Sequence, residues 1–395
     1  MRTTPNSNRI TIGLFGRRNA GKSQLMNTIT SQNISVVSPI EGTTTDPVKK
    51  AMEFIPVGPV LFIDTAGIDD FGELGSLRVE KTQKMMHSTD FGLYVIDAAE
   101  PEDAELERTK ALFKRFNVSL IKVVNKIDTV SAEQLEKART LHPDAAFVSA
   151  KTGENIFQLK EVLIKRLQTQ AEDPSLIGDL VDYGANVVMV VPVDSEAPKG
   201  RLILPQVQMI RDCLDNGIKC HVVRDVELAD VLRDLKKVDL VITDSQAFKE
   251  VSEIVPEAIP LTSFSILFTR QKGDLNLMMK GVESLNTLED GSRVLISEAC
   301  THNVSCEDIG RFKLPRLLKK KLNRDLNIEV IGGKDFPVDL KDYDLVIHCG
   351  GCMLNRKGMQ TRLMFCEESG VPVTNYGTAL AWLNGIFDRA TEIFR

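Results

Sequence analysis

One short stretch near the N-terminus restricts the fold of this chain more than any other part of it. Residues 16–23 read Gly-Arg-Arg-Asn-Ala-Gly-Lys-Ser and match the pattern G-x-x-x-x-G-K-S. An apolar, strand-like run, Ile10–Phe15, precedes the stretch, and a helical pattern follows it over residues 22–30. This context predicts a loop whose backbone N–H groups surround a phosphate at the N-terminus of a helix. The chain therefore begins with an α/β nucleotide-binding pattern.

The rest of the first 170 residues continues this pattern. Short apolar runs alternate with helical patterns, which predicts βαβ units and a mostly parallel sheet. The predicted strands are residues 10–15, 60–64, 91–97, 120–125 and 146–149. A polar stretch with a proline at residues 168–175 predicts a linker, and two further α/β patterns follow it. We therefore predict an α/β fold with an N-terminal P-loop domain over residues 1–170 and two smaller α/β domains over residues 171–263 and 264–395.

The P-loop residues have separate predicted roles. Gly16, Ala20 and Gly21 belong to the curled backbone whose N–H groups point at the β-phosphate. Lys22 supplies a positive charge to the β- and γ-phosphates, and the Ser23 hydroxyl binds Mg²⁺.

Two later segments complete the phosphate side of the predicted site. Asp64-Thr65-Ala66-Gly67 ends a predicted strand, which places the Asp64 carboxylate near Mg²⁺ and the Gly67 N–H at the γ-phosphate. Residues 41–47 read Glu-Gly-Thr-Thr-Thr-Asp-Pro, and we predict that Thr44 closes on Mg²⁺ and the γ-phosphate as part of a switch segment. Lys22, Thr44 and Gly67 are therefore the predicted catalytic residues.

The base-recognition residues follow in the order expected for guanine. Asn125-Lys126-Ile127-Asp128 ends a predicted strand, and the Asp128 carboxylate can accept hydrogen bonds from the guanine N1–H and exocyclic amine. Adenine lacks this donor pair and would leave the carboxylate unpaired, at a cost of roughly 1–3 kcal/mol. Ser149-Ala150-Lys151 follows one strand later and can present a backbone N–H to the guanine O6. These motifs predict GTP rather than ATP.

Two residues refine the expected hydrolysis. Ile68 stands where Ras-like enzymes place a glutamine that orients water, and Asn19 stands at a P-loop position that helps hold K⁺ in some relatives. In these residues the chain resembles the translation-factor-related small GTPases of tRNA modification and ribosome assembly. Because phosphoryl transfer mainly needs charge stabilisation, K⁺ can replace an arginine finger. We therefore predict slow, K⁺-stimulated hydrolysis, with a simple turn role for Asn19 as the alternative.

Charge and hydropathy exclude other classes. A formal net charge of −6 argues against a protein that binds nucleic acid mainly through charge. The sequence shows no signal-peptide pattern and no apolar run of the roughly 18 residues that a membrane span needs. We therefore expect a cytoplasmic protein that binds neither nucleic acid nor membrane.

A cluster of cysteines and histidines marks the C-terminal region. Cys300-Thr301-His302 follows a predicted strand at residues 294–297, and His348-Cys349-Gly350-Gly351-Cys352 follows another at residues 345–347. Because the carboxyl ends of parallel strands meet at one edge of a sheet, both clusters are expected in one crevice, with Glu307 nearby. Three thiolates with such neighbours are enough to hold a metal ion or a cluster.

The residue types alone leave four interpretations of this cluster. A structural zinc site of three cysteines and one histidine and an iron–sulfur cluster are equally consistent with the ligands. A Cys-x-x-Cys redox pair would leave Cys300 and both histidines unexplained, and buried, inert cysteines are the fourth interpretation.

The union of the GTPase motifs with C-x-H and H-C-x-x-C resembles one family over essentially the whole chain, the maturation GTPases of FeFe-hydrogenases, called HydF. This resemblance implies a scaffold or carrier that binds a 4Fe–4S cluster and hosts assembly of a diiron precursor from two radical-SAM maturases. It also implies delivery of that precursor to the hydrogenase apoprotein. By position, Cys300, Cys349 and Cys352 would be the cluster ligands, with His302, Glu307 or His348 as the fourth. The middle domain would make a homodimer, and the last domain would bind the cluster.

The sequence is also consistent with two rival functions. The first is a K⁺-dependent GTPase of tRNA modification or ribosome assembly with a structural zinc site, against which the acidic balance argues. The second is a metal-sensing switch that binds GTP without useful turnover.

Overall fold

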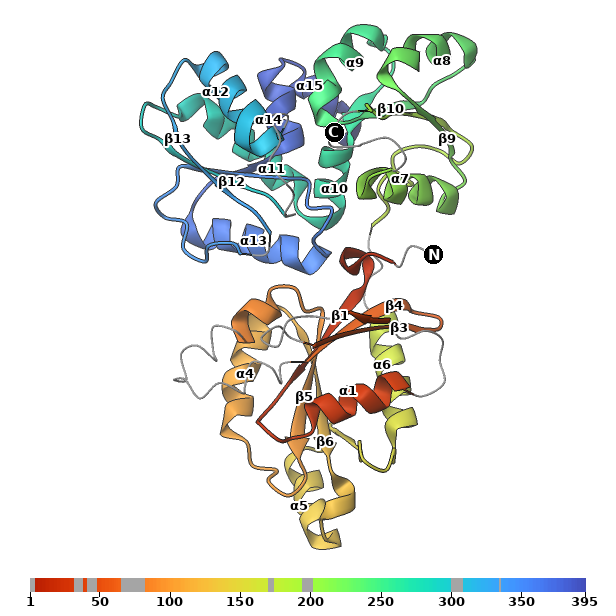
Figure 1. Ribbon diagram of the computed structural model, residues 1–395, viewed down its shortest axis with the longest axis vertical. Coiled ribbons are helices and arrows are strands. Elements are labelled where there is room, and N and C mark those ends of the chain that lie inside the picture. Colours follow the sequence, from red (N-terminus) through yellow and green to blue (C-terminus); the bar gives the residue numbers. More distant parts are fainter. Residues whose placement is uncertain are drawn as a thin grey trace. The chain divides into compact units, whose positions relative to one another are not determined.

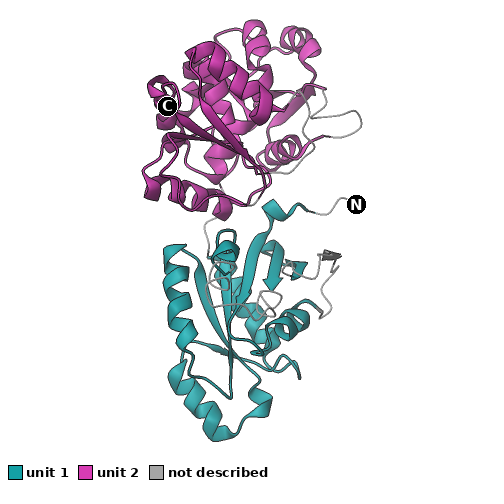
Figure 2. Ribbon diagram, turned by 60° about the vertical axis from the view of Figure 1, so that its left-hand side comes forward, with its two compact units in different colours: residues 1–172 teal, residues 173–395 magenta. Residues whose placement is uncertain are grey.

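The computed structural model describes residues 4–31, 38–40, 48–64, 82–169, 174–193, 202–299, 308–333 and 335–395. The chain forms two compact units, Met1–Glu172 and Asp173–Arg395 (Figure 2). Within the described residues, no helix is both long and apolar enough to cross a membrane.

The first unit is built on a seven-stranded sheet with the order β2-β3-β4-β1-β5-β6-β7. Its strands are β1 (Ile10–Phe15), β2 (Ser38–Ile40), β3 (Val48–Phe54), β4 (Gly58–Asp64), β5 (Phe91–Asp97), β6 (Ser119–Asn125) and β7 (Ala146–Phe147). Its helices are α1 (Lys22–Ser31), α4 (Ala104–Arg115), α5 (Ala132–Leu141) and α6 (Ile156–Gln168). The five predicted strands are all present, and they pair in parallel from β4 to β7.

The sequence did not predict the antiparallel pair β2 and β3 at one edge of this sheet. Strand β3 reads Val-Lys-Lys-Ala-Met-Glu-Phe, and its charged residues weaken the apolar alternation by which a strand is recognised. At a sheet edge such residues reach solvent, so the strand forms without a strong pattern.

Helices cover both faces of the first sheet. Alternate side chains of β1 point to opposite faces, as expected for a strand. Leu14 packs in one core with Leu25 of α1 and Leu163 of α6. Phe15 meets Phe113 of α4 edge-on, with ring centroids 5.0 Å apart. Figure 1 shows α1 and α6 on one side of the sheet and α4 on the other.

The second unit contains two parallel four-stranded sheets. The first has the order β11-β10-β8-β9 and the second β13-β12-β14-β15. The strands are β8 (Asn186–Val190), β9 (Lys219–Val223), β10 (Leu240–Thr243), β11 (Leu261–Ser263), β12 (Arg293–Ser297), β13 (Asn327–Ile331), β14 (Leu345–His348) and β15 (Val373–Asn375). The helices are α7 (Leu204–Asp215), α8 (Leu228–Asp234), α9 (Phe248–Ile254), α10 (Phe264–Lys272), α11 (Leu275–Glu283), α12 (Leu314–Leu322), α13 (Arg356–Ser369), α14 (Tyr376–Leu383) and α15 (Phe387–Thr391). The predicted α/β class is therefore confirmed for the whole chain.

Helix α10 connects the two sheets of this unit. Phe264, Leu267 and Phe268 are buried in the core under the first sheet. The same helix also contacts α13 and α14 of the second sheet (Figure 1). Its side chains therefore reach both halves of the unit.

Candidate nucleotide site and candidate metal centre

The loop after β1 has the curled backbone that a phosphate-binding loop requires. Gly16, Asn19 and Gly21 all have positive φ angles, of 127°, 62° and 92°. A Cβ on Gly16 would lie 2.2 Å from the carbonyl oxygen of Val95, and one on Gly21 would lie 2.3 Å from Nδ2 of Asn125. Both positions therefore require glycine for conformation and for space.

Lys22 holds its ammonium group over this loop. The side chain is buried, and Nζ donates hydrogen bonds to the carbonyl oxygens of Gly16 (2.8 Å) and Arg17 (3.0 Å). Asp64 is the last residue of β4 and pairs in register with Leu14 near the end of β1. The buried Asp64 carboxylate therefore lies at the same sheet edge as the P-loop, as a Mg²⁺-binding role requires.

Asn125 joins three of the predicted motifs. Its Nδ2 donates to the carbonyl oxygen of Ala20 in the P-loop (2.9 Å), and its Oδ1 accepts from the N–H of Ala150 (2.9 Å). The hydroxyl of Thr28 in α1 donates to the carbonyl oxygen of Ala150 (2.7 Å). The phosphate loop and the two base-recognition segments are thus one hydrogen-bonded assembly, although they lie more than 100 residues apart.

Lys126 and Asp128 are held by further polar contacts. Lys126 has a left-handed backbone (φ 66°), and its Nζ lies 2.7 Å from Oδ2 of Asp97. The buried Ser149 hydroxyl donates to Oδ1 of Asp128 (2.6 Å) and accepts from the N–H of Thr152 (3.1 Å). The carboxylate predicted to recognise guanine is therefore oriented by the following Ser-Ala-Lys motif.

Exchanging this carboxylate for an amide should change the preferred base. Xanthine has a carbonyl where guanine has its exocyclic amine, and an asparagine can donate to that carbonyl while accepting from N1–H. We expect Asp128→Asn to weaken GTP binding about tenfold to a hundredfold and to strengthen binding of xanthosine triphosphate. Titration calorimetry with both nucleotides checks this, with the exposed Glu133→Gln as the control. An unchanged preference for GTP would contradict the assignment.

The second predicted site lies at the carboxyl edge of the second sheet in the C-terminal unit. Strands β12 and β14 are parallel neighbours, with Ser297 opposite His348. The N–H of Ala299 donates to Sγ of Cys349 (3.1 Å), so the residue before Cys300 lies at the sulfur of the other motif. Thr44 and Gly67 of the nucleotide site, and Cys300, His302 and Glu307 here, lie outside the described residues.

The loop after β14 is shaped by its two glycines. We call residues 349–354 the cysteine loop. A Cβ on Gly350 would lie 3.1 Å from Oγ of Ser265 in α10, and one on Gly351 would lie 2.3 Å from Cε of Met359 in α13. Gly351 also has a left-handed backbone (φ 67°). The Cys-Gly-Gly-Cys sequence therefore lets the loop pass between two helices.

The cysteine sulfurs lie in a largely buried environment. Burial, and to a smaller extent Cys352, raises the pKa of the Cys349 thiol to about 11. Burial also raises the pKa of Cys352, and the positive charge of Lys272 offsets part of that effect. Sγ of Cys349 accepts a second N–H bond, from Gly351 (3.4 Å). Such N–H···S bonds stabilise a metal-bound thiolate.

His348 is held by the protein at both ring nitrogens. Nδ1 donates to the carbonyl oxygen of Cys349 (2.6 Å), and Nε2 accepts from Nη1 of Arg362 (2.9 Å). Burial, followed by the nearby charge of Arg362, lowers the pKa of His348 to about 3. The imidazole is therefore neutral, and Nε2 would have to give up its bond to Arg362 before it could bind a metal.

Sequence analysis did not identify two buried, positively charged side chains beside this loop. Arg362 donates to Oγ of Ser297 (3.1 Å) and to the carbonyl oxygen of Gly333 (2.6 Å), and Lys272 donates to the loop itself. A lysine in the last turn of a helix is typical of a dipole-compensating surface residue, so its sequence position gave no signal of burial. Among the described residues, no three His, Cys, Asp or Glu side chains gather closely enough to hold a metal ion.

The first unit is thus a P-loop GTPase domain, followed by a two-sheet α/β unit with a cysteine loop. Three family models match successive parts of the chain, one in the first unit and two in the second. Residues 11–126 match a model described as a 50S ribosome-binding GTPase. Residues 176–273 match the hydrogen maturase F dimerization domain, and residues 276–393 match the hydrogen maturase F tetramerization domain. The chain belongs to the hydrogen maturase F family, as its motifs indicated.

Curated relatives match only part of the chain. GTPase Der of Wolinella succinogenes is 36% identical over 167 residues, which cover 40% of this chain and 35% of the relative. GTPase Der of Campylobacter jejuni (strain 81-176) is 31% identical over 225 residues, which cover 50% of this chain and 48% of the relative. The chain therefore spans about a third of the length of the first relative and about half of the second.

Solved structures give more distant likenesses. Era of Aquifex aeolicus bound to GDP·AlF₄⁻ is 20% identical, with a TM-score of 0.32, over 54% of this chain and 91% of that one. The G domain of the FeoB iron transporter of T. maritima is 23% identical, with a TM-score of 0.28, over 40% of this chain and 98% of that one.

Proposed function

We propose that this protein is a cytoplasmic, GTP-hydrolysing scaffold that binds a 4Fe–4S cluster, assembles a diiron precursor on it and delivers the precursor to FeFe-hydrogenase. Membership of the hydrogen maturase F family supports the maturation role. The observation that supports the cluster is the bond from Ala299 N–H to Cys349 Sγ, because it places the residue that precedes the first cysteine motif at the sulfur of the second. The partners that follow are two radical-SAM maturases and the hydrogenase apoprotein.

The chemistry of the described donors fits an iron–sulfur cluster. Cys349 and Cys352, together with Cys300, would supply three thiolates, and the N–H groups of Ala299 and Gly351 already donate to the Cys349 sulfur. Because Nε2 of His348 accepts from Arg362, we infer that the fourth ligand is His302 or Glu307. When bound, the cluster would supply an iron with one weakly held ligand.

Anaerobic reconstitution with iron and sulfide tests this proposal. We expect a brown protein with about four iron atoms per chain and the broad visible absorbance of an iron–sulfur cluster. A colourless protein that retains zinc instead would exclude the cluster and favour the rival GTPase with a structural zinc site.

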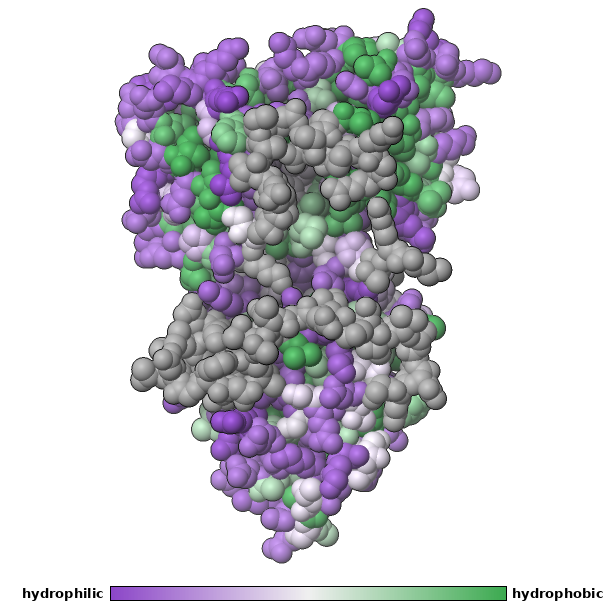
Figure 3. Space-filling view, in the orientation of Figure 1, coloured by the Kyte–Doolittle hydropathy of each residue, from purple (hydrophilic) through white to green (hydrophobic). Residues whose placement is uncertain are grey.

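Self-association is supported by the matches to dimerization and tetramerization domains. Exposed hydrophobic side chains beside the first sheet of the second unit also favour self-association. Val207, Leu214, Val222 and Val226 are large, exposed hydrophobic residues on or next to α7 and β9. Figure 3 shows hydrophobic side chains gathered on this part of the unit. We propose that a homodimer covers them, because burial of exposed apolar area favours association.

K⁺ should accelerate GTP hydrolysis through Asn19. The left-handed backbone of Asn19 would by itself explain an asparagine at this turn. The experiment must therefore distinguish the effect of the backbone conformation from that of the side-chain amide. Asn19→Gly retains that conformation and removes the amide. We expect K⁺ to stimulate wild-type turnover at least about tenfold over Na⁺, and the variant to lose this stimulation. Equal stimulation of both proteins would leave Asn19 as a turn residue only.

We further propose that the bound nucleotide controls partner exchange and does not supply chemistry to the cluster. The motivation is that the nucleotide site and the cysteine loop belong to different units. Identical partner affinities and transfer rates with GTP, GDP and no nucleotide would contradict this role.

A further inference from the structure

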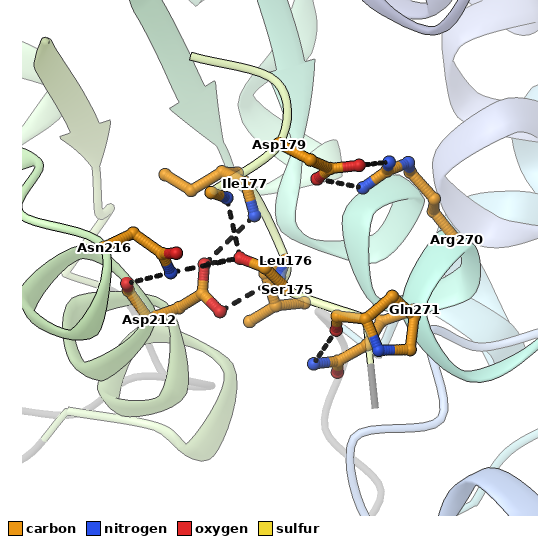
Figure 4. A network of polar contacts seen from close by, with 10 residues as sticks. Ser175, Leu176, Ile177, Asp179, Asp212, Asn216, Arg270 and Gln271 are labelled. Carbon is orange, nitrogen blue, oxygen red and sulfur yellow. Dashed lines mark hydrogen bonds and ion pairs between the residues drawn. The ribbon is translucent and has the colours of Figure 1, made fainter. Parts of the chain in front are cut away.

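The first described residues of the second unit, which include the last two residues of the predicted linker, are held tightly by the rest of that unit. We call residues 174–179 the anchor segment. Asp212 of α7 accepts from the N–H groups of Leu176 and Ile177 (3.0 Å each) and from the hydroxyl of Ser175 (2.7 Å). Leu176 and Ile177 are also buried in the core that contains Phe268 of α10. The chain that leaves the nucleotide domain therefore enters this unit through a fixed segment (Figure 4).

Two adjacent residues at the end of α10 hold the same segment. Arg270 forms a two-pronged ion pair with Asp179, in which Nη1 lies 3.0 Å from Oδ1. Gln271 donates from Nε2 to the carbonyl oxygen of Pro174 (3.0 Å). Figure 4 shows both side chains directed from α10 toward the anchor segment.

The next residue of α10 holds the cysteine loop. Lys272 is only 5% exposed, and its Nζ donates to the carbonyl oxygens of Leu354 (2.8 Å), Cys352 (3.3 Å) and Gly351 (3.5 Å). The ammonium group also lies 5.4 Å from the ring centroid of Phe268. A buried ammonium group is costly unless its donors are satisfied, so these carbonyl groups must stay with the lysine.

We propose that the last turn of α10, Arg270 to Lys272, couples the anchor segment to the cysteine loop, with Lys272 as the positioning residue of that loop. Consecutive residues of one helical turn share a rigid backbone, so a displacement of the anchor segment is passed to the carbonyl groups around Cys352. The coupling goes beyond the proposed cluster function, and its relevance to cluster binding rests on that proposal.

Hydrogen exchange of the metal-free, full-length protein tests both ends of this link. Lys272→Met removes the donors and keeps much of the apolar stem, so we expect amides of residues 349–355 to exchange at least about tenfold faster. Lys280→Met, at an exposed position of α11, is the matched control and should leave these amides unchanged.

The coupling itself is tested from the anchor side. Asp179→Asn removes the partly exposed ion pair with Arg270 and lies outside the cysteine loop. We expect exchange to rise about twofold to fivefold in the anchor segment and also in residues 349–355. Asp215→Asn, which removes an exposed pair with Arg211 on α7, should leave the cysteine loop unchanged. Wild-type exchange in the cysteine loop of either Lys272→Met or Asp179→Asn would overturn the proposal.

The reduction potential of the reconstituted cluster distinguishes a positioning role of Lys272 from a role in folding alone. In the reconstituted protein, loss of the Lys272 charge should make the reduction potential of the cluster more negative, because a nearby cation favours the more negatively charged reduced form. Lys272→Arg should restore most of the wild-type potential. If the wild-type protein bound no cluster, the proposed function would fail, whereas the exchange measurements would still decide the coupling.

Discussion

Replacement of Cys349 by serine is expected to abolish cluster binding and to leave GTP hydrolysis unchanged. The Cys349 sulfur is buried and accepts N–H bonds from Ala299 and Gly351. A serine oxygen is a harder and much less acidic ligand, so it holds iron poorly. Loss of a residue that only hydrogen-bonds to a metal ligand commonly lowers metal affinity tenfold to a hundredfold. Loss of a ligand itself should therefore lower the iron content at least about tenfold. Iron analysis and visible absorbance measure the loss, and phosphate release measures turnover.

Cys220→Ser provides the control for this experiment. Cys220 is partly buried in β9 of the other sheet and is a free cysteine like Cys349. Its replacement should retain both iron and turnover. A Cys349→Ser protein with wild-type iron content would show that this residue is not a cluster ligand.

The second large effect is expected at the P-loop. Lys22→Ala should lower GTP turnover by about two to three orders of magnitude, since it removes a preorganised positive charge from the β- and γ-phosphates. Iron binding should remain at the wild-type level, which makes this variant the reciprocal of Cys349→Ser. Single-turnover hydrolysis and iron analysis on the same preparation measure the two properties.

Folding must be checked in this variant, because Lys22 also donates to the carbonyl oxygens of Gly16 and Arg17. The thermal unfolding midpoint serves for this purpose, and Lys137→Met, at an exposed ion pair, is the matched control. If Lys22→Ala does not fold, Ser23→Ala offers a second test, because its loss should raise the Mg²⁺ concentration needed for turnover. Wild-type turnover in a folded Lys22→Ala protein would contradict the assigned role.

Sequence analysis predicted the nucleotide domain more completely than the rest of the chain. Its motif residues occupy short, contiguous segments, and their conformations are local, as the left-handed backbones of Gly21 and Lys126 illustrate. The alternation of strand and helix patterns between those segments also predicted that the strands pair in parallel. Strand β7 is shorter than expected, since it ends at Phe147, although Val148 still donates its N–H to the carbonyl oxygen of Val124.

The short strands of the second unit were harder to predict. Strands β11 and β15 have three residues each, which is too short for a periodic pattern. Strand β13 reads Asn-Ile-Glu-Val-Ile at the edge of its sheet and is only partly buried. All three form because a neighbouring strand supplies their hydrogen bonds, and the local sequence contains no record of that neighbour.

The sequence of the P-loop by itself determined the class of the first domain and its nucleotide chemistry. The two cysteine motifs likewise indicated a shared sheet edge, because their positions after parallel strands follow from the chain order. Only the tertiary structure decided which cations lie against the cysteine loop. Lys272 reaches the carbonyl oxygen of Leu354 across 82 residues of sequence, and Arg362 reaches Ser297 across 65. Burial of a charge at such separations depends on how α10, α13 and the loop pack together, and no local pattern encodes that packing.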